Sequence, residues 1–122
     1  MKQFKDLQFS KQHILAERDI HRWNAALDLD HYTISVVYGD GAYGSGPKSD
    51  TYEVAVYEDG RDDPIPLQGD DNGPILGLVS GEEISVLMKI LQDEPQFGIA
   101  CRVFHRTRYN RRFSNISDLH ST

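Results

Sequence analysis

The fold is decided by the stretch YTISVVY at residues 32–38, in which Ile34, Val36 and Tyr38 fall on one face at a period of two. A period of two is the side-chain repeat of a β-strand. Residues 51–57, TYEVAVY, repeat the pattern with the same preference for β-branched and aromatic side chains, which pack well on a pleated surface. The sequence therefore predicts two strands joined by the glycine-rich loop at 39–47.

The chain before and after this pair predicts further strands. A tight turn at Asp30 and His31 connects an expected strand at 25–29 to the one at 32–38. Pro64 and Pro66 flank Ile65, and proline is found in strands only at the edge of a sheet, so any strand here must be an edge strand. Shorter strands are expected at residues 75–79 and, at an edge, for Ile65 and Leu67.

One helix is expected at about residues 81–92. Ser80 and Glu83 have the spacing of a capping box, in which each side chain accepts the backbone N–H of the other residue. The apolar positions that follow have the i, i+3, i+4, i+7 spacing of a helix packed on one face. They are Ile84, Leu87, Met88 and Leu91.

Two segments leave alternatives open. Residues 1–23 allow a helix that Ser10 caps and that ends near Trp23, but an extended chain over 13–20 agrees with the sequence equally well. Residues 97–113 have both a helical stripe and a strand alternation, and the helix is favoured. The stripe is Phe97, Ala100, Cys101 and Phe104; the alternation is Ile99, Cys101 and Val103.

The expected architecture is a single α+β domain over residues 1–113, followed by a flexible tail at 114–122. It contains a twisted antiparallel sheet of three to five strands, with the helix at 81–92 on one face and a basic C-terminal segment. Of the 122 residues 39% are hydrophobic, which suffices for a core. The N-terminus lacks the apolar stretch of a signal peptide, so a cytoplasmic protein is expected.

Charge is divided unevenly along the chain. Residues 1–100 hold 8 Lys and Arg against 18 Asp and Glu, whereas residues 101–122 hold 5 Arg against one Asp. The five histidines and the single Cys101 lack zinc-ligand spacing, and the acidic residues lack that of a calcium loop. The sequence therefore indicates no metal, no cofactor and no membrane partner, and no catalytic residues stand out.

The loop motif GDGAYG at residues 39–44 has the G-x-G-x-x-G spacing of dinucleotide-binding turns. Those turns lead into a helix, whereas this motif leads into another strand. A protein-kinase phosphate loop would require a lysine where Tyr57 stands. A hairpin connection is the favoured interpretation, with Tyr43 as a contact residue. A small nucleotide-binding protein or enzyme that uses the loop from Gly39 to Gly46 is the weaker alternative.

Two charged segments are candidate binding surfaces. The acidic segment favours a solvated loop, with a basic partner as the functional alternative; its candidate residues are Asp62, Asp63, Asp70 and Asp71. The basic segment interleaves arginine with aromatic residues, as in proteins that bind single-stranded nucleic acid. Docking onto the acidic body or onto a second subunit is favoured, because the rest of the chain repels a polyanion. Its candidates are Arg102, Arg106, Arg108, Tyr109, Arg111 and Arg112.

Residues 32–38, the loop with Ala42-Tyr43-Gly44, TYEVAV at 51–56 and the helix start SGEE at 80–83 follow one another in order. Together they resemble a group of small uncharacterised phage and prophage proteins over about residues 25–92. The resemblance carries no motif of known chemistry. It implies a phage-derived accessory protein in the cytoplasm of the host.

The predicted function is therefore non-catalytic binding to a host or phage protein, in the form of an inhibitor of a host defence or housekeeping factor. Nucleic-acid binding through residues 102–112 is the first alternative, and a homo-oligomer is compatible with either. Nucleotide chemistry at the glycine loop is the second alternative.

Overall fold

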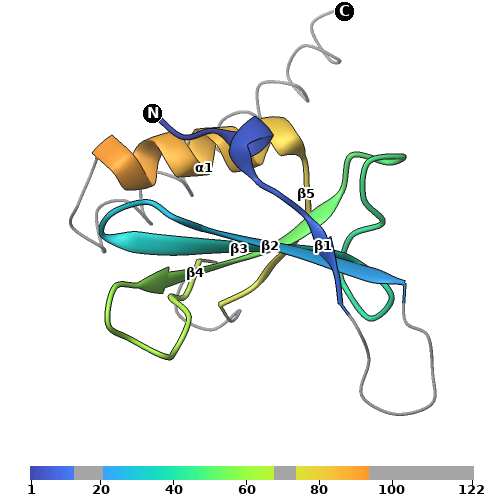
Figure 1. Ribbon diagram of the computed structural model, residues 1–122, viewed down its shortest axis with the longest axis horizontal. Coiled ribbons are helices and arrows are strands. Elements are labelled where there is room, and N and C mark those ends of the chain that lie inside the picture. The colour runs from blue at the N-terminus through green and yellow to red at the C-terminus, as the bar shows by residue number, and fades with distance from the viewer. Residues whose placement is uncertain (13–20, 68–73, 94–122) are drawn as a thin grey trace, which may run out of the picture.

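A computed structural model describes residues 1–12, 21–67 and 74–93, and it has the expected α+β architecture. Five antiparallel strands form one sheet in the order β1-β2-β3-β4-β5, and one α-helix covers one face (Figure 1). A short 3-10 helix, η1, precedes the first strand. The elements are η1 Phe4–Asp6, β1 Ser10–Lys11, β2 Arg22–Asp28, β3 Tyr32–Gly39, β4 Tyr52–Glu58, β5 Leu76–Val79 and α1 Gly81–Asp93.

The two strands predicted around the glycine loop are confirmed and form the centre of the sheet. Val36 pairs with Ala25 of β2 on one side and with Val54 of β4 on the other. All three side chains face α1 and are at most 3% exposed, because residues in register share a face. The turn at Asp30 is also confirmed: Asp30 has a left-handed φ of 75°, and the Leu29 N–H donates to the Tyr32 carbonyl.

The predicted edge strand at Ile65 and Leu67 is wrong as a strand. Pro64 forms a single bridge with Tyr57, and the Ile65 N–H donates to the Val56 carbonyl at 2.7 Å. Both side chains are nevertheless buried in the core, with Ile65 4% and Leu67 1% exposed. The prolines on either side of Ile65 have no N–H to donate, so the segment cannot continue the ladder.

Helix α1 is confirmed with its capping box. The Glu83 N–H donates to Ser80 Oγ at 3.1 Å, and the Ser80 N–H donates to Glu83 Oε1 at 3.4 Å. The predicted stripe Ile84, Leu87, Met88 and Leu91 is at most 1% exposed. Helix α1 therefore fills the core side of the sheet.

The sequence leaves two alternatives open for residues 1–23, a helix from Ser10 to Trp23 or an extended chain over 13–20. Both ends of the helical alternative are strands, and residues 13–20 lie outside the described part. Ser10 belongs to β1 and Trp23 to β2, where the Trp23 ring stacks on Tyr38 with centroids 5.3 Å apart. Phe9 packs edge-on against the same tyrosine at 5.1 Å. This aromatic cluster at the β1 end of the core explains why the N-terminal segment is extended there.

The N-terminal segment is fastened to α1 by side chains far away in sequence. The Lys2 N–H donates to Gln92 Oε1 at 2.9 Å, and Gln92 Nε2 donates back to the Lys2 carbonyl at 2.8 Å. The Phe4 N–H donates to Ser85 Oγ. The predictions for 97–113 and 114–122 fall outside the described residues.

Asp50 caps α1 from the loop between β3 and β4, since its Oδ1 accepts the Gly81 N–H at 3.0 Å. Replacing Asp50 with alanine is expected to lower the free energy of unfolding by about 1 kcal/mol, because a helix N–H loses its acceptor and a negative charge leaves the N-terminus. Urea denaturation measures the loss. Asp30→Ala is the matched control, because Asp30 is also left-handed but lies in a strand turn; equal losses for the two variants would contradict the cap.

Candidate functional site

The described surface has its most unusual feature at β5, where the strand bulges. Tyr52 pairs with Val79 and Val54 pairs with Leu76, so Gly77 and Leu78 both lie opposite the single residue Glu53. Leu76 and Val79 are three positions apart and would face opposite sides of a regular strand. The extra residue turns both into the core, where they are 2% and 0% exposed.

The bulge leaves Leu78 in an unfavourable position. Its φ is 55°, in the left-handed region, and 66% of its surface is exposed to solvent. A left-handed backbone costs an L-residue with a side chain roughly 1–2 kcal/mol. Because the Leu78 side chain is mostly in solvent, its burial adds little to the free energy of folding and does not offset this strain.

The glycine-rich loop after β3 holds Leu78 in place. The Leu78 N–H donates to the Tyr43 carbonyl at 2.7 Å, and the Tyr43 N–H donates to Glu53 Oε1 at 3.2 Å. Two glycines allow this close packing. A Cβ at Gly44 would lie 2.5 Å from the backbone Cα of Tyr52, and one at Gly77 would lie 2.6 Å from the side-chain Cβ of Tyr43. The loop is therefore packed onto β4 and β5, which makes it more fixed than a plain flexible connection.

Tyr43 itself is 69% exposed beside Leu78. We call these two side chains, with the backbone that joins them, the Tyr43–Leu78 surface. An exposed tyrosine is a common anchor residue of protein interfaces, and the exposed leucine beside it adds apolar contact area. Strained backbone of this kind is commonly retained where function requires it.

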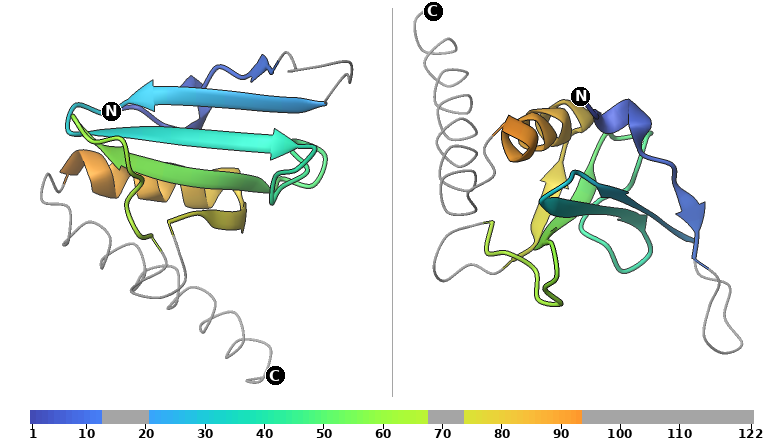
Figure 2. Two further views of the ribbon diagram at one scale, coloured as in Figure 1. Left: turned by 90° about the horizontal axis from the view of Figure 1, so that it is seen from below. Right: turned by 60° about the vertical axis from the view of Figure 1, so that its left-hand side comes forward.

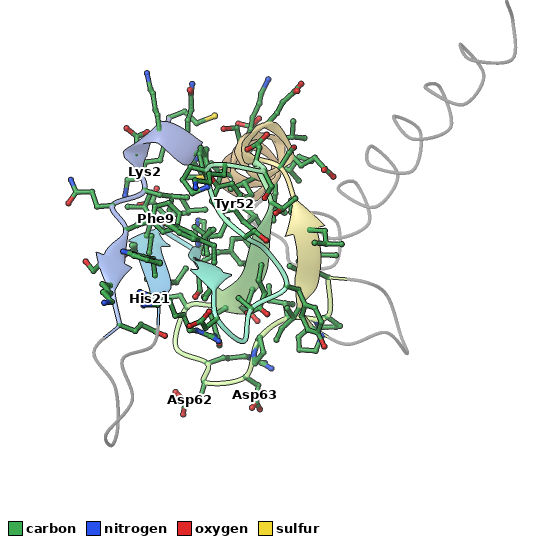
Figure 3. All side chains as sticks on the ribbon, turned by 90° about the vertical axis from the view of Figure 1, so that its right-hand side faces the viewer. Lys2, Phe9, His21, Tyr52, Asp62 and Asp63 are labelled. Carbon is green, nitrogen blue, oxygen red and sulfur yellow. The ribbon has the colours of Figure 1, made fainter. Side chains whose placement is uncertain are left out.

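The other predicted site residues of the described chain lie elsewhere. Asp62 and Asp63 are exposed in the loop after β4 and point away from the sheet (Figure 3). With Glu58, Arg61 and the segment 64–66 they line an open hollow of about 580 Å³. Arg61 Nε lies 3.4 Å from Glu58 Oε2, an exposed ion pair of small energetic value.

The structure does not bring the acidic residues and Tyr43 together. They lie at opposite ends of β4, whose seven residues span roughly 20 Å at about 3.3 Å per residue. The remaining predicted site residues lie outside the described part. These are Asp70, Asp71, Arg102, Arg106, Arg108, Tyr109, Arg111 and Arg112.

Two tyrosines have perturbed ionisation, and neither belongs to an exposed site. Burial raises the pKa of Tyr52, with smaller contributions from Asp50 and Tyr38. Burial and, less strongly, Glu58 raise the pKa of Tyr32. Both side chains lie in the hydrophobic core, so core packing accounts for their raised pKa values.

In residues 1–12, 21–67 and 74–93, His, Cys, Asp and Glu form no group of three that could hold a metal ion. In the same ranges no helix is long and apolar enough to cross a membrane.

The sequence missed Leu78, because a period of two over LGLV places it on the same face as Leu76. The one available signal was Gly77, since an isolated glycine within a strand pattern often marks a bulge. The direction of Leu78 depends on the register of β5 against β4, which the sequence of β5 alone does not contain.

Comparisons of the chain with protein-family models, with curated proteins and with solved structures find no match.

Proposed function

We propose that this protein acts without catalysis by binding a host or phage protein through the Tyr43–Leu78 surface. The observation that carries the proposal is Leu78, a large apolar side chain held in solvent on a left-handed backbone. The sequence resemblance to phage proteins supports a host factor as the partner, and inhibition of a defence or housekeeping factor as the outcome.

The geometry of the Tyr43–Leu78 surface supports a small, well-ordered contact at the centre of a larger protein interface. Two hydrogen bonds hold the backbone beneath Tyr43 and Leu78, and Gly44 and Gly77 pack closely beside it, so little conformational entropy is lost when a partner covers the two side chains. Two such residues cover less area than a stable interface of roughly 800 Å² per partner. They therefore serve as the anchor of a larger contact.

Leu78→Gly separates binding from folding. Glycine adopts the left-handed backbone without strain, so the free energy of unfolding is expected to stay constant or rise by up to about 1 kcal/mol. Binding is expected to weaken at least tenfold, because truncating an anchor costs roughly 2 kcal/mol. Urea denaturation gives the stability, and capture from host lysate with quantitative mass spectrometry gives the binding.

Lys89→Ala is the control for this capture, because Lys89 is exposed on α1, on the other side of the sheet. A specific partner should be retained by the wild-type chain and by the control, and lost by Leu78→Gly and by Tyr43→Ala. Proteins retained equally by all four chains would remove the Tyr43–Leu78 surface from consideration. Turnover of a substrate by the purified chain would refute the non-catalytic proposal.

A further inference from the structure

The dipeptide Asp-Gly occupies the centre of two tight turns, at residues 39–42 after β3 and 58–61 after β4. In each turn the N–H of the fourth residue donates to the carbonyl of the first, at 3.1 Å and 3.0 Å. Gly41 and Gly60 have φ values of 76° and 79°, and a positive φ at the third residue alone is typical of a type II turn. Both dipeptides are exposed. The same reactive sequence thus stands twice in the same backbone geometry.

Asp-Gly is the dipeptide in which aspartate isomerises most readily, because glycine has no side chain to hinder approach to its nitrogen. The glycine nitrogen attacks Cγ of the aspartate, a C–N bond forms, and the carboxyl group loses water. Water then opens the resulting succinimide at either carbonyl carbon, which gives aspartate again or isoaspartate. The reaction requires the carboxyl group and the following peptide group to rotate towards each other. Contacts that hold either group therefore slow it.

At Asp40 both reacting groups are held. The His21 N–H donates to Asp40 Oδ2 at 3.0 Å, which fixes the carboxyl group. The Asp40 carbonyl belongs to the peptide group that contains the Gly41 nitrogen, and Arg22 Nη1 donates to it at 3.3 Å. The Asp40 N–H also donates to the His21 carbonyl at 2.9 Å. Isomerisation at Asp40 therefore requires contacts with the start of β2 to break.

At Asp59 the two reacting groups are not held in this way. The Asp59 N–H donates to the His31 carbonyl at 2.9 Å. Within residues 1–12, 21–67 and 74–93, however, no hydrogen bond or ion pair reaches the Asp59 carboxyl group or its carbonyl oxygen. The nearby Arg61 is paired with Glu58 instead. A Cβ at Gly60 would meet nothing within 4 Å, so the glycine has room to rotate.

We propose that Asp59 is a site of spontaneous isomerisation to isoaspartate in the folded protein, and that Asp40 is protected from it. The product keeps its negative charge but lengthens the backbone by a methylene group, so the turn at 58–61 loses its present geometry. This turn borders the open hollow after β4. The two turns lie at opposite ends of the sheet (Figure 2, left), so the change is remote from the Tyr43–Leu78 surface.

The full chain is incubated at neutral pH and body temperature, once folded and once unfolded in urea, and samples are digested with trypsin. Cleavage after Arg22, Lys48 and Arg61 places the two Asp-Gly pairs in separate peptides. Electron-transfer fragmentation identifies isoaspartate at each site, and a protein isoaspartyl methyltransferase labels it independently. The Asn72-Gly73 pair falls in a third peptide, where deamidation is recognised because it changes the mass.

The quantity measured is the ratio of the isomerisation rate at Asp59 to that at Asp40. In urea the ratio is expected to be close to unity, because the dipeptide is the same. In the folded chain it should rise at least about tenfold, because a hydrogen bond to a charged acceptor must break before Asp40 reacts. An equal ratio in the folded and unfolded chains would overturn the proposal. So would a folded chain without isoaspartate at Asp59 after the unfolded chain has converted.

Two variants test the cause of the difference. Arg22→Ala removes a contact to the Asp40 peptide group, so it should speed isomerisation at Asp40 and leave Asp59 unchanged. Gly60→Ala should slow the reaction at Asp59 alone, because the added Cβ hinders attack by the nitrogen. General unfolding of either variant would speed both sites and is thereby recognised. An unchanged rate at Asp40 in Arg22→Ala would contradict the proposed protection by the Arg22 contact.

Discussion

Replacing Gly39 with alanine is expected to lower the free energy of unfolding by about 2–5 kcal/mol. Gly39 ends β3 with a φ of 107°, which costs an alanine roughly 1–2 kcal/mol. A Cβ there would lie 2.2 Å from the His21 carbonyl oxygen and 3.0 Å from the Arg22 Cα. Both are backbone atoms, one at the start of β2 and one in the residue before it, so relief requires the backbones to separate, at a further cost of about 1–3 kcal/mol.

Gly60→Ala is the matched control for this prediction. Gly60 is also left-handed, with a φ of 79°, but a Cβ there would meet nothing within 4 Å. Its substitution should cost only the backbone strain, roughly 1–2 kcal/mol. Urea denaturation of both variants gives the difference. Equal losses would mean that β2 and β3 move apart freely at Gly39, against the close backbone approach described above.

The central elements could be predicted from sequence because their patterns are local. Residues 32–38 and 51–57 alternate without interruption, and the capping box and stripe of α1 lie within 12 residues. Each pattern therefore specifies its own element and its buried face. The strands lie in the sheet in chain order, as is usual for consecutive strands, although only β2 and β3 are joined by a short turn.

The N-terminal segment could not be predicted because long-range contacts determine its conformation. Strand β1 has two residues, and Lys2 bonds to Gln92, 90 positions away. The edge strand expected for Ile65 and Leu67 does not form, because the neighbouring prolines permit only a single bridge between Pro64 and Tyr57. In both cases the local pattern was too short to outweigh tertiary packing.

Of the two residues of the Tyr43–Leu78 surface, the sequence indicated Tyr43 and gave no indication of Leu78. Tyr43 could be found because a tyrosine at the tip of a glycine-rich hairpin has no core to enter. Leu78 could not, because the bulge that exposes it is created by packing Leu76 and Val79 on the same side of β5. The loop with Tyr43 could therefore be recognised from the sequence, whereas the exposure of Leu78 follows only from the register of β5 against β4.

Leu87→Ala is expected to lower the free energy of unfolding by about 2–5 kcal/mol, because Leu87 of α1 is 0% exposed and its removal leaves a cavity against the sheet. Leu78→Ala makes the same chemical change at a position that is 66% exposed. Its cost should stay within about 0.5 kcal/mol, since no cavity forms. Chemical denaturation of the two variants, with unchanged m-values, provides the comparison.

The difference between these two losses of stability shows whether the Leu78 side chain contributes to folding. If the two losses differ as expected, the folded state gains almost nothing from the Leu78 side chain, while its left-handed backbone still costs roughly 1–2 kcal/mol relative to glycine. Stability then gives no reason for leucine at this position, and a contact outside the fold becomes the remaining physical reason. If Leu78→Ala destabilises as much as Leu87→Ala, Leu78 is a core residue, and the proposed binding function loses the observation that carries it.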